Sequence, residues 1–165
     1  RNEYHANKPQ IFSSIQVDDL RSSTVEYSKN YDVVIIDVQG SDSRSLRTAL
    51  LISDIVYVPF IPSQNDIEVI EDLSSLLEDT QLQNNHRKTF YILNNCSVHY
   101  LDQSINDAEI FFKDYLHVFS PSKVRIYNRK VYKVASSEGL GVIETNDSKS
   151  KIEILSLKKE IESYV

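Results

Sequence analysis

The chain has 165 residues, of which 41% are hydrophobic and 25% charged, a balance typical of one compact globular domain. This apolar content is enough for a core and excludes a disordered tail, while the single cysteine excludes a disulfide scaffold. No apolar run reaches the ~20 residues of a membrane-spanning helix. The formal net charge of −6 argues against a protein that is basic throughout and binds nucleic acid by charge alone. We therefore expect one cytoplasmic domain over residues 1–165, with no membrane partner.

Segments of strand and helix character alternate along the chain. Residues 10–15 are expected to form a short strand and 17–28 a helix. The uninterrupted apolar run Val-Val-Ile-Ile at 33–36 predicts the clearest strand, one that is covered on both faces of a sheet. Strands that alternate with helices predict an α/β fold, a mostly parallel sheet with helices on both faces. The later predicted segments are helix 43–52, strand 55–58, helix 65–82, strand 89–93, helix 101–116, strand 124–127, helix 130–138 and helix 149–164.

Polar residues follow the apolar strands, and in an open α/β sheet ligands bind beyond the carboxyl ends of the strands. Asp37 follows the Val-Val-Ile-Ile run. Pro62 and Ser63 follow the next strand, and Asn94 follows the one after it. An aspartate at the end of a buried strand is suited to orient a water molecule on Mg²⁺. An aspartate that only caps the following turn has the same local sequence, so both interpretations of Asp37 stay open at this point.

Residues 31–73 combine these features in one uninterrupted stretch, YDVVIIDVQGSDSRSLRTALLISDIVYVPFIPSQNDIEVIEDL. A strand ending in Asp37 leads into a Gly-Ser-Asp-Ser loop, a helix with a Leu-Arg-Thr-Ala-Leu core, and a Ser-Asp step. The next strand runs into Pro-Phe-Ile-Pro-Ser-Gln-Asn-Asp. In this order and spacing the stretch resembles the ParA/MinD family of deviant P-loop ATPases, in particular its plasmid and chromosome partition branch. The pair Leu93-Asn94 and the late run from Arg129 to Glu144 are similar to the same family.

The resemblance implies ATP and Mg²⁺ as ligands, with particular residues in particular roles. Asp37 would fix the Mg²⁺–water network, and Gly40 would let the backbone approach the γ-phosphate. Pro62 and Ser63 would border the base, and Asn94 would read adenine through its amide. The alternatives are an ordinary turn glycine, a rigid strand exit, and an asparagine that only satisfies backbone groups at the strand end.

The resemblance also implies partners. Members of the family dimerise with ATP between the subunits, bind DNA without sequence specificity, and are stimulated by a centromere-binding partner protein. We therefore expect a homodimer, nonspecific DNA and such a partner, in a bacterial cytoplasm close to the nucleoid. Arg125, Arg129, Lys130 and Lys133 form a local basic cluster that would contact DNA phosphates. A charged face that only contacts water is the alternative.

The sequence departs from the family in one defining element. The glycine-rich loop that ends in Gly-Lys-Ser/Thr and cradles the phosphates is absent, and the sequence contains no methionine. We therefore expect an N-terminally incomplete ATPase domain that hydrolyses ATP only when the P-loop is supplied. Two other functions stay open: a non-catalytic interaction domain of the same fold, and a receiver domain phosphorylated on Asp37. A receiver also needs an acidic pair at the end of its first strand, and Asp18-Asp19 lie in a predicted helix.

Overall fold

The computed structural model describes residues 5, 7–8, 11–16, 20–39 and 42–164, apart from the side chains at 64–68. Within this part of the chain, three strands form one all-parallel sheet, and six α-helices accompany it. The predicted α/β class with a parallel sheet is therefore confirmed. The strands, in their spatial order, are β1 (Ile55–Phe60), β2 (Lys88–Leu93) and β3 (Ser120–Pro121).

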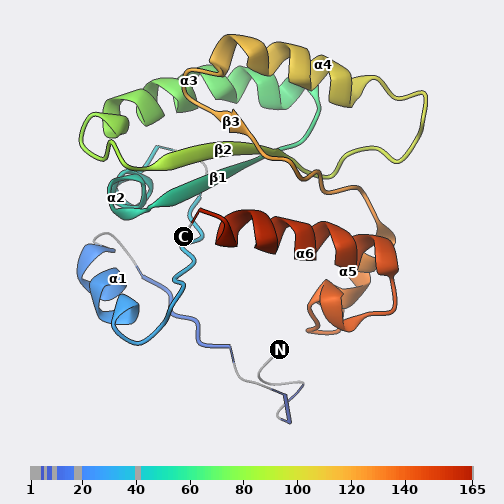
Figure 1. Cartoon of the computed structure of the whole chain (residues 1–165), viewed down its shortest axis with the longest axis horizontal. Coiled ribbons are helices and arrows are strands. Elements are labelled where there is room, and N and C mark those ends of the chain that lie inside the picture. Colours follow the sequence, from blue (N-terminus) through green and yellow to red (C-terminus); the bar gives the residue numbers. More distant parts are fainter. Residues whose placement is uncertain (1–4, 6, 9–10, 17–19, 40–41, 165) are drawn as a thin grey trace.

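The helices are α1 (Arg21–Ser28), α2 (Arg44–Ile52), α3 (Gln64–Gln81), α4 (Ser104–Phe111), α5 (Lys130–Ser137) and α6 (Ser148–Glu162). Figure 1 shows α3 and α4 on one face of the sheet and α5 and α6 on the other, as the alternation of segments predicts. α1 stands apart from the sheet in the same view and buries none of its own residues. No helix among the described residues is both long enough and apolar enough to cross a membrane.

Local sequence explains why α2 begins and packs where it does. The Ser43 side chain accepts a hydrogen bond from the backbone N–H of Leu46 at 3.1 Å, which satisfies one of the free donors at the start of the helix. Leu46, Ala49 and Leu50 recur at helical spacing and are all buried. α2 therefore presents one apolar face to the interior and leads directly into β1.

The core consists of aromatic and aliphatic side chains that alternate between the two faces of the sheet. On the face covered by α4, the Tyr91 ring stacks on Phe112 with centroids 3.8 Å apart, and the Phe60 ring meets Phe112 edge-on at 4.9 Å. On the face covered by α6, Tyr57 stacks on its register partner Phe90 at 5.1 Å. Successive strand residues point to opposite faces, so both faces of β1 and β2 are packed.

The prediction of a buried strand at 33–36 is wrong for this structure. Residues 33–39 form no regular element, and the side chains of Val33 and Ile35 are 58% and 88% exposed. The apolar pattern is that of a strand, but a strand forms only where a neighbouring strand pairs with its backbone. None of the described residues pairs with this segment.

Three further predictions need correction. The short strand predicted at 10–15 is not formed in its described part, residues 11–15. The helix predicted at 17–28 is present as α1 from Arg21, and residues 17–19 lie outside the described residues. The expected strand at 124–127 is reduced to an isolated parallel bridge between Cys96 and Tyr127, and the paired strand is the two-residue β3. The predicted helix 101–116 is shorter: α4 ends at Phe111 and continues as one 3₁₀ turn, Phe112–Tyr115.

Candidate functional site

Two of the predicted site segments lie side by side at the carboxyl edge of the sheet. The backbone N–H of Asn94, just after β2, donates to the carbonyl oxygen of Phe60 at the end of β1 at 2.8 Å. Pro62 and Ser63 follow Phe60 after one intervening residue. Asn95, two residues beyond the end of β2, adopts a left-handed backbone conformation with φ of 55°, and Cys96 after it forms a parallel bridge with Tyr127. The strand ends therefore bring the 62–63 turn and Asn94 to the same rim.

Two side chains at this rim, those of Asn94 and Ser63, have no hydrogen-bond partner in the part of the chain that the structure describes. The side-chain amide of Asn94 is half-buried and makes no hydrogen bond with the described residues. Ser63 is exposed at the start of α3, and its hydroxyl makes no capping hydrogen bond. An amide offers both a donor and an acceptor, which is the chemistry needed to read the edge of a nucleotide base.

Asp37 lies in the extended segment 33–39 and is exposed. Side chains alternate along this segment: Ile36 and Val38 face a cavity beside β1, so Asp37 points to the other side. Among the described residues, no hydrogen bond or ion pair joins Asp37 to Ser63 or Asn94. Gly40, the predicted γ-phosphate residue, lies outside the described residues.

The four predicted DNA-contacting residues divide into two pairs. Arg125 forms an ion pair with Glu109. Arg129 binds Glu153 through two nitrogens, at 2.7 Å and 2.8 Å, and this hydrogen bonding raises the pKa of its guanidinium. Both arginines therefore already have carboxylate partners. The other two residues, Lys130 and Lys133, are exposed on α5.

Glu153 is a buried polar centre that the sequence analysis did not single out. Besides Arg129, it accepts hydrogen bonds from the Tyr132 hydroxyl at 2.9 Å and the Tyr127 backbone N–H at 3.3 Å. Glu160, seven residues later on the same face of α6, accepts from the Tyr57 hydroxyl at 3.0 Å. The seven-residue spacing of Glu153 and Glu160 places both on one face of a helix, and this spacing could have indicated them from the sequence.

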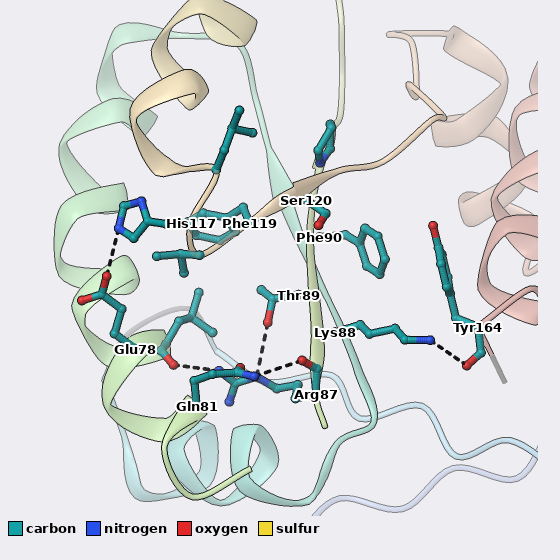
Figure 2. Close-up of a pocket in the computed structure, with 14 residues that line it drawn as sticks. Glu78, Gln81, Arg87, Lys88, Thr89, Phe90, His117, Phe119, Ser120 and Tyr164 are labelled. Atoms are coloured by element: carbon teal, nitrogen blue, oxygen red, sulfur yellow. Dashed lines mark hydrogen bonds and ion pairs between the residues drawn. The ribbon is translucent and has the colours of Figure 1, made fainter. Parts of the chain in front are cut away.

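A separate cavity of about 500 Å³ lies at the opposite edge of the sheet, where β2 and β3 begin. Figure 2 shows Arg87 at one end of it, with Glu78 and His117 on one side and Lys88 and Tyr164 on the other. The His117 ring nitrogen pairs with the Glu78 carboxylate at 2.9 Å. Of the predicted nucleotide-site residues that the structure describes, Asp37, Pro62, Ser63 and Asn94, none lines this cavity.

Arg87 owes its position to the ends of two helices. Arg87 is buried, with only 4% of the residue exposed, and the terminal nitrogens of its guanidinium donate to the carbonyl oxygens of Leu50 at 3.0 Å and Leu77 at 2.8 Å. It also donates to the hydroxyls of Thr80 and Thr89. The C-terminal parts of helices carry partial negative charge, so they stabilise a buried cation that has no carboxylate partner among the described residues. Arg87 is thus explained by packing, without a ligand.

Comparison of the sequence with known protein families and with curated proteins found no match.

Proposed function

We propose that the chain is part of an ATP-dependent partition protein of the ParA/MinD type, which binds ATP with Mg²⁺, dimerises and binds DNA without sequence specificity. The resemblance of residues 31–73 to that family supports the proposal. The observation that carries it furthest is the shared rim of the parallel sheet. There the 62–63 turn and Asn94 follow the ends of two neighbouring strands, which the bond from Asn94 N–H to Phe60 O joins, at the edge where α/β sheets bind nucleotides.

The residues present fit the chemistry of the two ligands. Asn94 would contact the adenine edge through its unpaired amide, with Pro62 and Ser63 bordering the base. Mg²⁺ commonly keeps several water molecules and takes one or two protein carboxylates together with phosphate oxygens. Asp37, which is exposed and has no cationic partner among the described residues, suits such a single-carboxylate role. The metal would supply charge neutralisation at the phosphates, and the phosphate-binding loop would come from outside the 165 residues.

The DNA contact is assigned to the exposed lysines of α5. Lys130 and Lys133 lie one helical turn apart at the start of α5 and are exposed, so their ammonium groups are available to phosphates. Arg125 and Arg129 are held by Glu109 and Glu153, and a phosphate would have to compete with these carboxylates.

The test compares two aspartate variants of the protein encoded by the complete gene. Mg·ATP binding is measured by isothermal titration calorimetry, and hydrolysis by phosphate release. Asp37→Asn should reduce Mg²⁺-dependent hydrolysis roughly 10- to 100-fold, because the carboxylate that orients the metal-bound water is lost. Asp114→Asn is the matched control: it removes the same charge from an exposed residue beyond α4 and should leave both quantities unchanged. Full hydrolysis in Asp37→Asn, or no heat from Mg·ATP with the wild-type protein, would refute the proposal.

A further inference from the structure

The cavity of about 500 Å³ lies where β2 and β3 separate, at the amino ends of the strands. The two strands pair only from Phe90 and Ser120 onward. Before that point, the backbone N–H groups of Val118 and Phe119 donate to the carbonyl oxygen of Tyr115 at 3.0 and 2.9 Å, since these residues belong to the turn that follows the 3₁₀ helix. The first residues of β2 therefore have no neighbouring strand on the β3 side, and the cavity occupies that place (Figure 2).

The backbone N–H of Thr89 faces this cavity without a hydrogen-bond partner. Lys88 N–H donates to Asp54 O at 2.9 Å, toward β1, so the next residue along the strand directs its N–H toward the β3 side. In the part of the chain that the structure describes, no acceptor binds this N–H, and Thr89 is only 7% exposed. Buried backbone donors are nearly always satisfied. A ligand that offers an acceptor oxygen would satisfy this one.

The charges in the lining leave a single positive charge without a partner. The acidic and basic side chains of the lining are Glu78, Arg87, Lys88 and His117. Glu78 pairs with His117 at 2.9 Å, and the carbonyl oxygens of two helices occupy the Arg87 guanidinium. The Lys88 ammonium has no carboxylate partner among the described residues; it lies 4.9 Å from the centroid of the Tyr164 ring and 3.5 Å from the Tyr164 carbonyl oxygen. With the imidazole neutral, one carboxylate would balance the net charge of the lining.

Apolar side chains, three of them aromatic, supply much of the remaining lining. They are chiefly Leu77, Phe90, Leu116, Val118, Phe119 and Tyr164. The Phe90 ring tilts against the Tyr164 ring with centroids 4.7 Å apart. Aromatic side chains favour a flat ring as the body of a ligand, since aromatic rings attract one another in offset and edge-on contacts. The volume also fits, because cavities of roughly 300–1,000 Å³ hold small organic molecules.

We propose that this cavity binds a small aromatic monocarboxylate. One carboxylate oxygen accepts a hydrogen bond from Thr89 N–H, and the exposed ammonium of Lys88 exchanges its 3.5 Å bond with Tyr164 O for the second oxygen. The ring packs among the apolar and aromatic side chains of the lining. This site goes beyond the proposed function and does not depend on it. A nucleoside triphosphate carries more negative charge than the lining balances, so the two sites take different ligands.

Titration of the protein encoded by the complete gene with naphthoate, followed by NMR of the backbone amides, tests the site. Naphthoate combines one carboxylate with a flat apolar ring system. The Thr89 amide proton should move downfield and saturate, because it gains a charge-assisted hydrogen bond, and the amides of Lys88 and His117 at the same cavity should shift with it. Ser63 and Asn94, at the opposite rim, should not shift. Naphthamide, the neutral amide of the same ring system, is the matched probe and should bind at least about tenfold more weakly.

Two variants test the charge and the space separately. Lys88→Met removes the ammonium and keeps an unbranched side chain, so it should weaken naphthoate binding about tenfold and leave naphthamide binding unchanged. Lys113→Met is its control, since Lys113 is exposed and lies outside the lining. Leu116→Trp fills the cavity from a position that is 53% exposed, so both probes should lose their binding while the core stays intact. Leu82→Trp, at an 88% exposed position outside the lining, should bind as the wild type does.

The proposal fails on any of four results. The first is a Thr89 amide that does not shift with naphthoate, which would mean that water satisfies its N–H. The second is equal affinity for naphthoate and naphthamide, or full naphthoate affinity in Lys88→Met. The third is equal naphthoate affinity in Leu116→Trp and Leu82→Trp. The fourth is a set of shifts confined to the opposite rim. Titration of the same samples with Mg·ATP separates the two proposals: naphthoate binding without ATP binding refutes only the proposed function, and ATP binding without a Thr89 shift on naphthoate refutes only this site.

Discussion

Replacement of Arg87 by methionine tests how the two helices on one side of the sheet are held to the start of β2. The guanidinium donates to Leu50 O in the last turn of α2 and to Leu77 O near the end of α3. Methionine keeps much of the aliphatic volume and removes every donor. The perturbation is therefore confined to the hydrogen bonds and the charge.

The magnitude follows from the bonds that are lost. A hydrogen bond from a charged donor contributes about 1.5–3 kcal/mol net, so the two carbonyl bonds of Arg87 represent roughly 3–6 kcal/mol. Burial lowers the pKa of Arg87, which shows that removing the cation from water costs free energy. Relief of that cost in the variant offsets part of the loss. We expect Arg87→Met to lower the free energy of unfolding by about 3 kcal/mol.

Urea denaturation of the 165-residue chain, followed by far-ultraviolet circular dichroism, measures this loss. Arg47→Met is the matched control, because Arg47 lies on α2, pairs with Asp42, and both side chains are about half exposed. Its unfolding midpoint should change little, since solvent screens such a pair. Equal midpoints for Arg87→Met and Arg47→Met would refute the role assigned to the buried guanidinium.

Three further outcomes are expected from the same fold. Glu153→Ala should cost about 2 kcal/mol in urea denaturation because it leaves the Arg129 guanidinium without its carboxylate; a change within experimental error would contradict this. Burial and the bond to Glu160 raise the pKa of Tyr57, so ionisation of this phenol favours unfolding above about pH 10. The melting temperature of Tyr57→Phe should accordingly fall less between pH 9 and 11 than that of the wild type, and parallel curves would refute this. Burial raises the pKa of the Cys96 thiol to about 11, so it should react with a disulfide reagent only on unfolding, and rapid labelling of the native chain would count against its position in the core.

The helices and strands that the sequence predicted correctly are those that are specified by local features of their own sequence. The apolar stripe and serine cap of α2 and the apolar runs of β1 and β2 specify local structure and burial together. The run 33–36 has the same apolar character, yet its pairing depends on a strand elsewhere in space. The local sequence pattern cannot show whether such a neighbouring strand is present. A strand was therefore predicted at 33–36, although none forms there.

The candidate site divides in the same way. Asn94 and the turn at 62–63 were expected at one rim because parallel strands end at a common edge, and the bond between Asn94 and Phe60 places them there. The pairing of Arg129 with Glu153 was not predicted. These residues are 24 positions apart, and they meet only because α6 packs across the sheet with its glutamates inward. Two of the four basic residues that the sequence suggested for DNA binding, Arg125 and Arg129, are therefore paired with carboxylates in the folded chain.

Mapping of ATP on the protein encoded by the complete gene tests the central claim most directly. Amide resonances are followed by NMR during titration with Mg·ATP, with Ser63 and Asn94 as reporters of the sheet rim and Arg87 and His117 as reporters of the opposite cavity. The account predicts saturable shifts at Ser63 and Asn94 and none at Arg87 and His117. Shifts confined to Arg87 and His117, or no shifts at saturating ATP, would contradict it.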